Sequence, residues 1–184
     1  MLTQLRSLIL LVIIEIERTF DHTYRRVTGL PQVRRSLITP NLYLGGQYNL
    51  EAFERLRHRG VTGIVNMRIH SIHKDISNLK DIRILNLPTP DLNAPTQADL
   101  KRGASFIKDE IQKGGKVYIH CRHGEGRGPT MAIAYLISSG LTYKDAFALV
   151  KKVRVFIRTT KVQMDALLEF ESTTKKEVPP ISKL

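Results

Sequence analysis

The body of the 184-residue chain alternates short apolar runs with stretches in which apolar residues recur every three or four positions. The short runs predict buried strands, and the longer pattern predicts helices that pack by one face. The predicted strands cover residues 42–44, 61–67, 82–87 and 116–120. This alternation favours an α/β fold, in which a single domain has a central, mostly parallel sheet flanked by helices.

Polar capping residues and glycines mark the predicted ends of the helices. Asn49 is placed to cap one helix, and Gly60 is placed to close it. Thr96 and Asp99 form a capping box for the next helix, which is predicted to end at Gly114. The later helices carry the same signals, namely Pro129 with Gly140, Thr142 with Asp145, and Thr160 with Gln163. Folds of this class bind ligands at the carboxyl ends of their strands, where loops lead into helices.

The first 37 residues differ in pattern from this body. Residues 8–14 read LILLVII, and a charged stretch follows without a cleavage site, which argues against a signal peptide. The run is also too short to span a bilayer, which needs about 20 residues. We therefore predict a helical extension over residues 1–37, a linker at Gly29-Leu30-Pro31, a domain over residues 38–172 and a tail over residues 173–184.

The apolar extension fits two roles. Its pattern favours a helix that docks on the domain or on a second copy of the chain. Arginines also flank the run, at positions 6, 25, 26, 34 and 35. Such a basic flank is typical of contact with an anionic membrane surface, here through residues 5–16. We expect docking, with membrane-surface contact as the alternative.

The balance of charge and the cysteine count narrow the possible ligands and the compartment. Twenty-nine Lys and Arg residues against 17 Asp and Glu residues leave a net charge of +12, which favours an anionic ligand. Only 7% of the residues are aromatic and no nucleic-acid-binding motif occurs, so we expect no specific nucleic acid partner.

The single cysteine excludes a disulfide framework and a Cys-rich zinc site, and it indicates a reducing, cytoplasmic environment. No metal and no cofactor is implied.

That cysteine opens the stretch that carries the candidate chemistry. Residues 117–130 read VYIHCRHGEGRGPT, which predicts a strand, a glycine-rich loop and the start of a helix. Gly124, Gly126 and Gly128 are expected to let successive amide groups turn inward around an anion. The helix beginning at Pro129 would turn its positive end toward the same point. The predicted phosphate-binding loop consists of Arg122, His123, Gly124, Glu125, Gly126 and Arg127.

Cys121 and Arg127 lie at the two ends of this loop. The sulfur of Cys121 would face the bound anion, and the loop amides and the helix dipole would stabilise its thiolate form. The planar guanidinium of Arg127 can hold two phosphate oxygens. Two other phosphate loops do not fit, because the lysine of GxxxxGK is missing and the glycines fall at alternate positions rather than as GxGxxG.

At these residues the sequence resembles the cysteine-dependent protein tyrosine phosphatases of the dual-specificity type, whose signature is His-Cys, five residues and Arg. The match reads HCRHGEGR. Further stretches that resemble the family are residues 41–46, residues 65–68 and residues 154–157 with Gln163, so that about residues 38–172 are covered.

The resemblance implies a role for each residue of the motif. Cys121 would be the nucleophile, and Arg127 would bind the phosphate and steady the transition state. His120 would tune the thiolate by bonding to the loop backbone. An aspartate on a separate loop would be the general acid.

A general acid is required in any case, because the leaving oxygen must be protonated as the cysteine takes the phosphoryl group. Asp91 is the best candidate, since it lies in the loop PTPDLNAP that follows a predicted strand, where the family carries its acid. Asp99 is the second candidate, but its place in a capping box gives it another role.

Two positions depart from the family pattern. Dual-specificity enzymes usually carry Ser or Thr directly after the loop arginine, where the hydroxyl helps the thiolate leave, and this chain has Gly128. We therefore expect slow hydrolysis of the phosphocysteine, unless Thr130 reaches the sulfur instead. Glu125 is expected to point away from the phosphate as a solvated residue at the rim, because a carboxylate facing the phosphate would repel it.

These residues together predict a hydrolase that dephosphorylates phosphomonoesters through a phosphocysteine intermediate. A phosphorylated protein is the expected substrate, a phospholipid or phosphoinositide is the main alternative, and a 5′-phosphorylated RNA is a third. Two other classes stay open. One is a phosphate-binding scaffold with weak turnover, which Gly128 would favour, and the other is a sulfurtransferase of the rhodanese type, which would not need Asp91.

Overall fold

A single five-stranded sheet forms the centre of the part of the chain that the structure describes. The structure is a computed structural model, and it describes residues 2–70 and 81–177. The strands are β1 (Leu37–Thr39), β2 (Leu42–Gly45), β3 (Val61–Asn66), β4 (Arg83–Asn86) and β5 (Lys116–His120). Their order across the sheet is β1-β2-β5-β3-β4. Only β1 and β2 pair antiparallel within this sheet, so the predicted mostly parallel sheet is confirmed.

Each predicted strand is present, with small differences at its ends. β5 has the predicted bounds, and β2 is one residue longer than predicted. β3 and β4 end one residue early, but Met67 and Leu87 still donate backbone hydrogen bonds to His120 and Asn66, each at 2.9 Å. The three-residue edge strand β1 is too short to produce a readable alternation of apolar and polar positions, and the sequence does not predict it.

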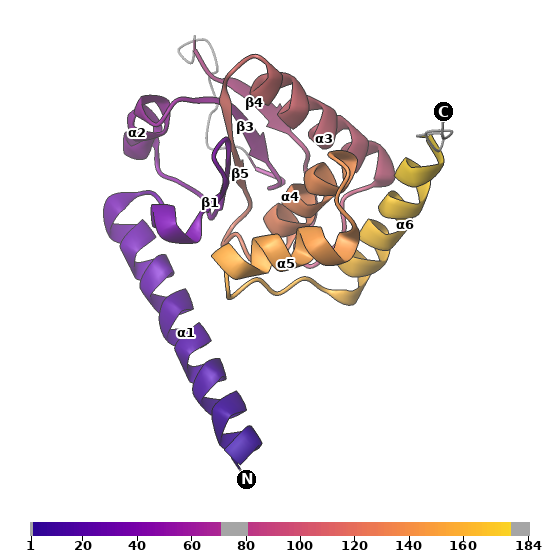
Figure 1. Ribbon diagram of the computed structural model, residues 1–184. Helices are drawn as coiled ribbons and strands as arrows, with labels where there is room; N and C mark the ends of the chain where they lie inside the picture. Colours follow the sequence, from indigo (N-terminus) through magenta and orange to yellow (C-terminus); the bar gives the residue numbers. More distant parts are fainter. Residues whose placement is uncertain (1, 71–80, 178–184) are drawn as a thin grey trace.

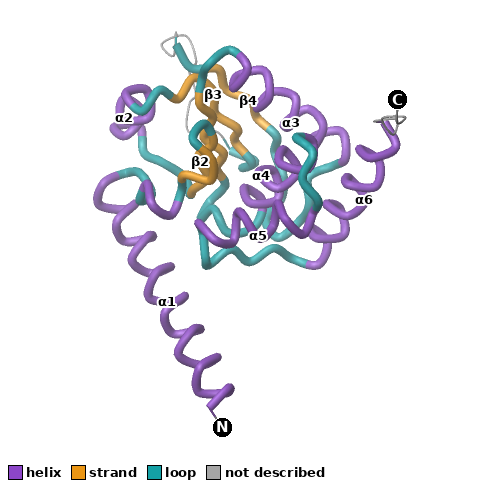
Figure 2. Tube along the Cα trace, viewed as in Figure 1, coloured by secondary structure: helices purple, strands orange, loops and turns teal. Residues whose placement is uncertain are grey.

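Helices cover both faces of the sheet, as predicted (Figure 2). Their bounds are α2 Phe53–His58, α3 Gln97–Gln112, α4 Arg127–Ser138, α5 Tyr143–Val153 and α6 Lys161–Glu177. Successive side chains of a strand point to opposite faces, so the central strands contribute to two separate cores. Val65 and Ile119 lie in the larger core, together with buried residues of α3, α4, α5 and α6. Ile64 and Tyr118 lie in the smaller core, together with buried residues of α2.

Polar side chains cap the helices at the predicted positions. The Asn49 side chain accepts a hydrogen bond of 2.8 Å from the N–H of Ala52, at the start of the 3-10 turn η2 (Leu50–Ala52) that leads into α2. Thr96 and Thr142 each accept a hydrogen bond from the N–H three residues further on. These bonds satisfy N–H groups that have no partner inside the helix, which explains why α3 and α5 begin where they do.

Two helix ends differ from the prediction. α4 begins at Arg127 rather than at Pro129, which is its third residue. Proline is tolerated there because the first N–H groups of a helix have no partner within it. α6 continues to Glu177, so residue 173, the predicted start of a tail, lies inside a helix.

The N-terminal helix α1 (Leu2–Thr28) joins the domain through the segment Gly29-Leu30-Pro31, which is packed against the domain. The N–H of Gly29 donates to the carbonyl of Arg25 at 2.7 Å, and its φ of 78° ends the helix in a left-handed turn. Leu30 is buried in the smaller core. The 3-10 turn η1 (Val33–Arg35) then leads into β1.

Only the second half of α1 docks on the domain. Asp21 is fully buried there, and His22 and Arg25 are partly buried beside it. Residues 4–13 are exposed, and this half projects beyond the domain (Figure 1). The expected docking on the domain is therefore confirmed for the second half alone. Among residues 2–70 and 81–177, none of the helices combines the length and the apolar character needed to cross a membrane.

Candidate active site

A cavity of about 180 Å³ lies where β5 ends and α4 begins. This is the carboxyl end of the parallel strands, where folds of this class bind ligands. The cavity is lined by Asp91, Leu92, Cys121, Arg122, His123, Glu125, Gly126, Arg127, Arg158, Thr160 and Gln163. The predicted Cys121, Arg127 and Asp91 therefore meet at one cavity, although Asp91 comes from a different loop.

The backbone between β5 and α4 has its carbonyl groups bound on the outer side. The carbonyls of His123 and Gly124 accept hydrogen bonds from the Arg154 guanidinium at 2.8 and 2.6 Å. The carbonyl of Glu125 accepts one from the N–H of Arg158 at 2.7 Å. A trans peptide unit points its C=O and its N–H in opposite directions, so the three N–H groups that follow these carbonyls point inward. This is the backbone arrangement that an anion nest requires.

Cys121 is buried at the base of this nest, with 3% of its surface exposed. The N–H of Gly124 donates a hydrogen bond to its Sγ at 3.2 Å. Gly126 precedes α4 and offers no side chain to cap the first N–H groups of that helix. These donors and the positive end of the α4 dipole favour negative charge in the cavity, on a bound anion or on the sulfur.

The glycines of the loop are needed for two different reasons. Gly124 has a φ of 72°, and a Cβ there would also collide with the backbone of Gly45. Gly126 has a φ of −121°, so it does not share the left-handed conformation of Gly124. A Cβ at Gly126 would lie 3.1 Å from the Gln163 side chain, so space is the constraint at this position.

Two contacts hold the guanidinium of Arg127 in place and leave one of its edges without a bond in the part of the chain that the structure describes. Its Nη1 donates to the carbonyl of Thr89 at 2.8 Å, and its Nη2 lies 2.9 Å from a carboxylate oxygen of Asp91. Its Nε is buried and has no hydrogen-bond partner within the described residues. A buried donor without a partner is costly in free energy, and an anion bound in the cavity would satisfy it.

Asp91 lies on an exposed loop that two residues of the α6 start hold in place. The hydroxyl of Thr160 donates to the carbonyl of Leu92 at 3.0 Å, and the Gln163 amide donates to the carbonyl of Asn93 at 2.9 Å. Leu92 has a φ of 64°, a left-handed conformation that is uncommon outside glycine. The strained residue directly after Asp91 and the two tethers give this loop a defined position beside the cavity.

The sequence assigns Thr160 and Gln163 to a capping box and misses this second role. The Gln163 side chain also accepts from the N–H of Thr160 at 3.0 Å, so the two roles coexist. Asp99, the second candidate acid, caps α3 through Thr96 and does not line the cavity.

Glu125 is not the solvated rim residue that the sequence suggests. Its carboxylate lies 2.9 Å from Nε of Arg18 and 2.8 Å from Nε2 of His22, both on α1, and 13% of the side chain is exposed. Burial raises the pKa of Glu125, but the hydrogen bonds from His22 and Arg18 outweigh this and lower the pKa to about 2. The carboxylate is therefore charged at neutral pH and points to the N-terminal helix.

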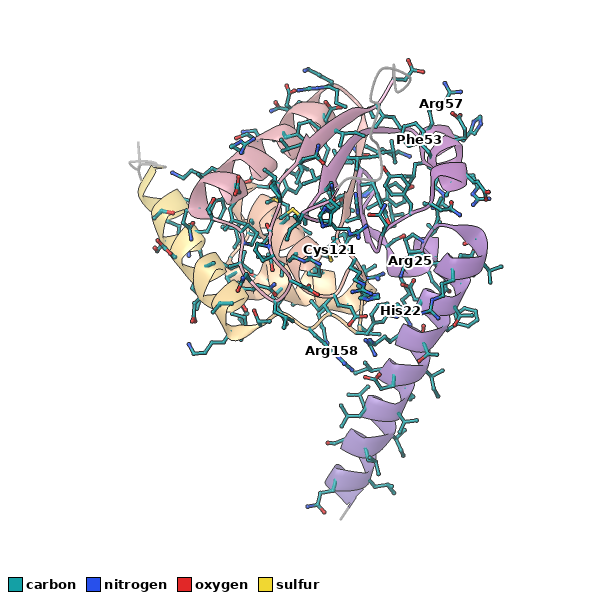
Figure 3. The ribbon with its side chains drawn as sticks, turned by 180° about the vertical axis from the view of Figure 1, so that it is seen from behind. His22, Arg25, Phe53, Arg57, Cys121 and Arg158 are labelled. Atoms are coloured by element: carbon teal, nitrogen blue, oxygen red, sulfur yellow. The ribbon has the colours of Figure 1, made fainter. Side chains whose placement is uncertain are left out.

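A second contact from α1 reaches the loop through Arg154. This arginine is fully buried and pairs with the fully buried Asp21 at 3.0 Å. In the sequence Arg154 belongs to a stretch that resembles the family and also to a basic run, which is typical of a solvated helix face and does not reveal which member is buried. The run consists of Lys151, Lys152, Arg154, Arg158 and Lys161. Figure 3 shows His22 and Arg25 on the side of α1 that faces the domain, near Arg158.

Neither residue 128 nor residue 130 supplies the Cys121 sulfur with the hydroxyl donor that the family pattern leads us to expect. A Cβ at Gly128 would lie 3.6 Å from Sγ of Cys121 and 3.0 Å from a methyl group of Leu44. The Thr130 hydroxyl donates to the carbonyl of Gly126 at 2.9 Å, so its proton is already engaged. The suggestion that Thr130 replaces the missing hydroxyl at the sulfur is therefore wrong.

The two histidines beside the cysteine are in different surroundings. His120 is buried at the end of β5, with its ring against Tyr48 and Tyr118 at centroid distances of 5.3 and 6.0 Å. His123 stacks on His22 with a centroid distance of 4.9 Å. Burial, together with the neighbouring His22, lowers the pKa of His123 to about 4.

The cysteine, the arginine and the anion nest define a site of the cysteine-dependent phosphatase class, and comparison with known proteins identifies the family. The family described as dual specificity phosphatase, catalytic domain, matches residues 42–173. This is well over half of the chain, and the chain belongs to this family. The resemblance inferred from the sequence is thus confirmed.

Curated relatives and solved structures agree with this assignment. Human dual specificity protein phosphatase 5 is 30% identical over 145 residues, which cover 77% of this chain and 37% of that protein. Dual specificity protein phosphatase PHS1 of Arabidopsis thaliana is 25% identical over 146 residues, which cover 76% of this chain and 16% of that protein. The chain thus spans well under half the length of these relatives. The crystal structure of PTPMT1 in complex with PI(5)P is similar with a TM-score of 0.71 and 26% identity, covering 76% of this chain and 96% of that one.

The lowered pKa of His123 predicts a pH dependence of stability. The unfolded chain takes up a proton at the ordinary histidine value of about 6.5, whereas the folded chain resists protonation until about pH 4. The free energy of unfolding should therefore fall as the pH is lowered from 6.5 toward 4. Thermal unfolding across this range should show a shallower decline for His123→Gln than for the wild type. The same substitution at the exposed His58 controls for the loss of a histidine as such, and equal slopes for wild type and His123→Gln would contradict the assignment.

Proposed function

We propose that the chain is a phosphomonoesterase that works through a phosphocysteine intermediate. The observation that carries this proposal is the single cavity lined by Cys121, Arg127 and Asp91. A scaffold that only binds phosphate would need the amide nest and the arginine. It would not need a carboxylate on a separate, tethered loop beside the cysteine.

In the first half of the reaction, Sγ of Cys121 attacks phosphorus, so that an S–P bond forms and the P–O bond to the leaving group breaks. Asp91 donates its proton to the leaving oxygen. Arg127 and the inward N–H groups bind the equatorial oxygens, and they need no rearrangement as the phosphoryl group becomes trigonal.

In the second half, water replaces the leaving group. Asp91, now a carboxylate, accepts a proton from the water as its oxygen attacks phosphorus, and the S–P bond breaks to return the thiolate and release inorganic phosphate. The leaving thiolate keeps the hydrogen bond from the N–H of Gly124, but it has no hydroxyl at position 128 to stabilise it. This favours slow breakdown of the phosphocysteine relative to its formation.

A phosphorylated protein is the substrate class that the family suggests, and a phosphorylated lipid is the second candidate. The exposed half of α1 supports the second. Its consecutive residues 8–13 are apolar and exposed, so the apolar surface runs all the way round the helix rather than along one stripe. A helix that is apolar all round is typical of burial on every side, which the apolar layer of a membrane provides.

The base of this apolar half lies beside the mouth of the cavity. Glu15 of α1 pairs with Arg158, which lines the cavity, and Arg18 pairs with Glu125. Insertion of the apolar half into an anionic membrane surface would bring these arginines to the level of the headgroups. A structural relative in the same family has been crystallised with PI(5)P. We propose peripheral membrane contact of a cytoplasmic protein through residues 5–16.

The catalytic assignment predicts distinct losses for two variants. Cys121→Ser should reduce hydrolysis of an aryl phosphate to background. Asp91→Asn should lower kcat by about 10²–10⁴-fold, more for phenyl phosphate than for nitrophenyl phosphate, because the poorer leaving group needs its proton more. Asp91→Asn should also flatten the decline of kcat toward alkaline pH. Asp99→Asn, in which the cap is preserved, is the matched control, and turnover by Cys121→Ser would refute the mechanism in favour of a scaffold or another enzyme class.

The missing hydroxyl at position 128 predicts a gain of function. A Cβ there has ordinary contact with the Cys121 sulfur, and only a Leu44 methyl group must shift by a few tenths of an ångström. Wild type should release a burst of the phenol product before a slower steady-state rate of release, because phosphocysteine accumulates. Gly128→Ser should shorten the burst and raise the steady-state rate, whereas Gly128→Ala adds the same Cβ without the hydroxyl and should not. Equal steady-state rates for the Ser and Ala variants would show that breakdown of the intermediate is not limiting.

Membrane contact predicts selective binding to anionic vesicles. The protein should float with vesicles that contain phosphatidylglycerol and bind weakly to phosphatidylcholine alone. Leu11→Asp should weaken this binding at least about tenfold, because it removes the apolar burial of one leucine side chain and adds a negative charge that the anionic lipids repel. Val162→Asp, at an exposed apolar position on α6, is the control. Undiminished flotation of Leu11→Asp, or a stable dimer in solution that Leu11→Asp dissociates, would contradict a lipid surface as the occupant.

A further inference from the structure

The helix α1 lies outside the residues 42–173 that match the phosphatase family, yet it contacts the phosphate-binding loop directly. Arg18 and His22 bind the carboxylate of Glu125, at 2.9 and 2.8 Å. The ring of His22 also stacks on His123, the residue two positions after the cysteine. The loop is thus bound from the outside by an element that the family match does not include.

A second line of contacts runs through the domain to the loop backbone. Asp21 of α1 and Arg154 are both fully buried and form an ion pair of 3.0 Å. Arg154 donates to the carbonyls of His123 and Gly124, and these bonds set the direction in which the following N–H groups point. Without Asp21, the buried charge of Arg154 would have no carboxylate to balance it.

The charge of Glu125 makes these contacts relevant to phosphate binding. The residue lines the cavity, and its carboxylate is ionised at neutral pH, so it can repel a phosphate in the nest. Two α1 side chains, Arg18 and His22, hold this carboxylate on the outer side, and Arg18 supplies positive charge next to it. A charge pair a few ångströms apart in a partly buried site changes binding by about 1–4 kcal/mol.

We propose that α1 is the positioning element of the phosphate-binding loop. Arg18 neutralises Glu125, Arg18 and His22 together hold its carboxylate away from the phosphate, and Asp21 fixes Arg154 behind the inward amides. Arg18, His22 and Asp21 are positioning residues, because they act on the phosphate through Glu125 and Arg154. This inference rests on the proposed function, since the task assigned to the loop is the binding of a phosphate.

A double-substitution cycle on the full chain tests the link between Arg18 and Glu125. The affinity for inorganic phosphate is measured by calorimetry for wild type, Arg18→Ala, Glu125→Gln and the variant with both changes. Arg18→Ala should weaken phosphate binding about fivefold, because the freed carboxylate then faces the anion. In the Glu125→Gln background the same substitution should change the affinity less than about twofold.

Controls separate positioning from a general loss of stability. Arg18→Lys should restore most of the affinity, because it returns the positive charge. Arg26→Ala removes the same charge from an exposed position of the same helix and should leave phosphate affinity unchanged. The thermal unfolding temperature is recorded for every variant. If Arg18 had a purely structural role, Arg18→Ala would lower this temperature equally with Glu125 and with Glu125→Gln, and its effect on phosphate affinity would not depend on residue 125.

A second variant tests the other line of contacts. Asp21→Asn should lower kcat/KM for an aryl phosphate by a larger factor than it weakens the binding of inorganic phosphate, because correctly directed amides stabilise the transition state more than they stabilise a bound phosphate. If Arg18→Ala weakens phosphate binding by the same factor in both backgrounds, or does not weaken it, the inference is wrong. If wild type neither binds phosphate nor hydrolyses the aryl phosphate, the proposed function fails instead.

Discussion

The arrangement of the site depends on the requirement that consecutive peptide units of one loop point their N–H groups to the same side. Because each C=O then points the opposite way, the carbonyls of His123, Gly124 and Glu125 need donors behind the loop. Arg154 and the N–H of Arg158 provide them. Arg154 in turn needs a counter-charge in its buried position, and Asp21 supplies it from α1. Removing one partner of such a buried pair costs about 3–5 kcal/mol.

This chain of requirements explains why the N-terminal helix has two unlike halves. Its second half is polar and meets the domain through ion pairs, with Asp21, Arg18 and His22 turned inward. Its first half is mostly apolar, and its residues 4–13 are exposed where the helix projects beyond the domain (Figure 1). The helix is continuous from Leu2 to Thr28 and, at 1.5 Å per residue, about 40 Å long. A surface that binds the apolar half is therefore connected by one rigid element to the loop that holds the candidate nucleophile.

The loop of Asp91 shows how a second, exposed segment gains a defined position. The carboxylate is 66% exposed, but it lies 2.9 Å from the buried Arg127. Thr160 and Gln163 hold the backbone of the two following residues. The Asp91 carboxylate is thus open to water while its distance from Arg127 stays fixed, which the proposed role of donating and then accepting a proton requires.

The sequence by itself determined four of the five strands, most of the helix ends and the placing of Cys121 and Arg127 on one loop, because strand periodicity, caps and a motif with fixed spacing act over short stretches of chain. Asp91 lies outside that motif and is predicted from its loop after a strand and from the resemblance to the family. It did not determine the surroundings of Glu125, the burial of Arg154, the hydroxyl partner of Thr130 or the tethering of the acid loop. The surroundings of Glu125 and Arg154 and the tethers of the Asp91 loop depend on partners far away in the sequence, such as Asp21 for Arg154. The Thr130 hydroxyl bonds only four residues back, to the carbonyl of Gly126, but several acceptors are within its reach and the sequence does not choose among them. Only the tertiary structure decided them, since a charge in a basic run carries no local signal of the residue that will bury and pair it.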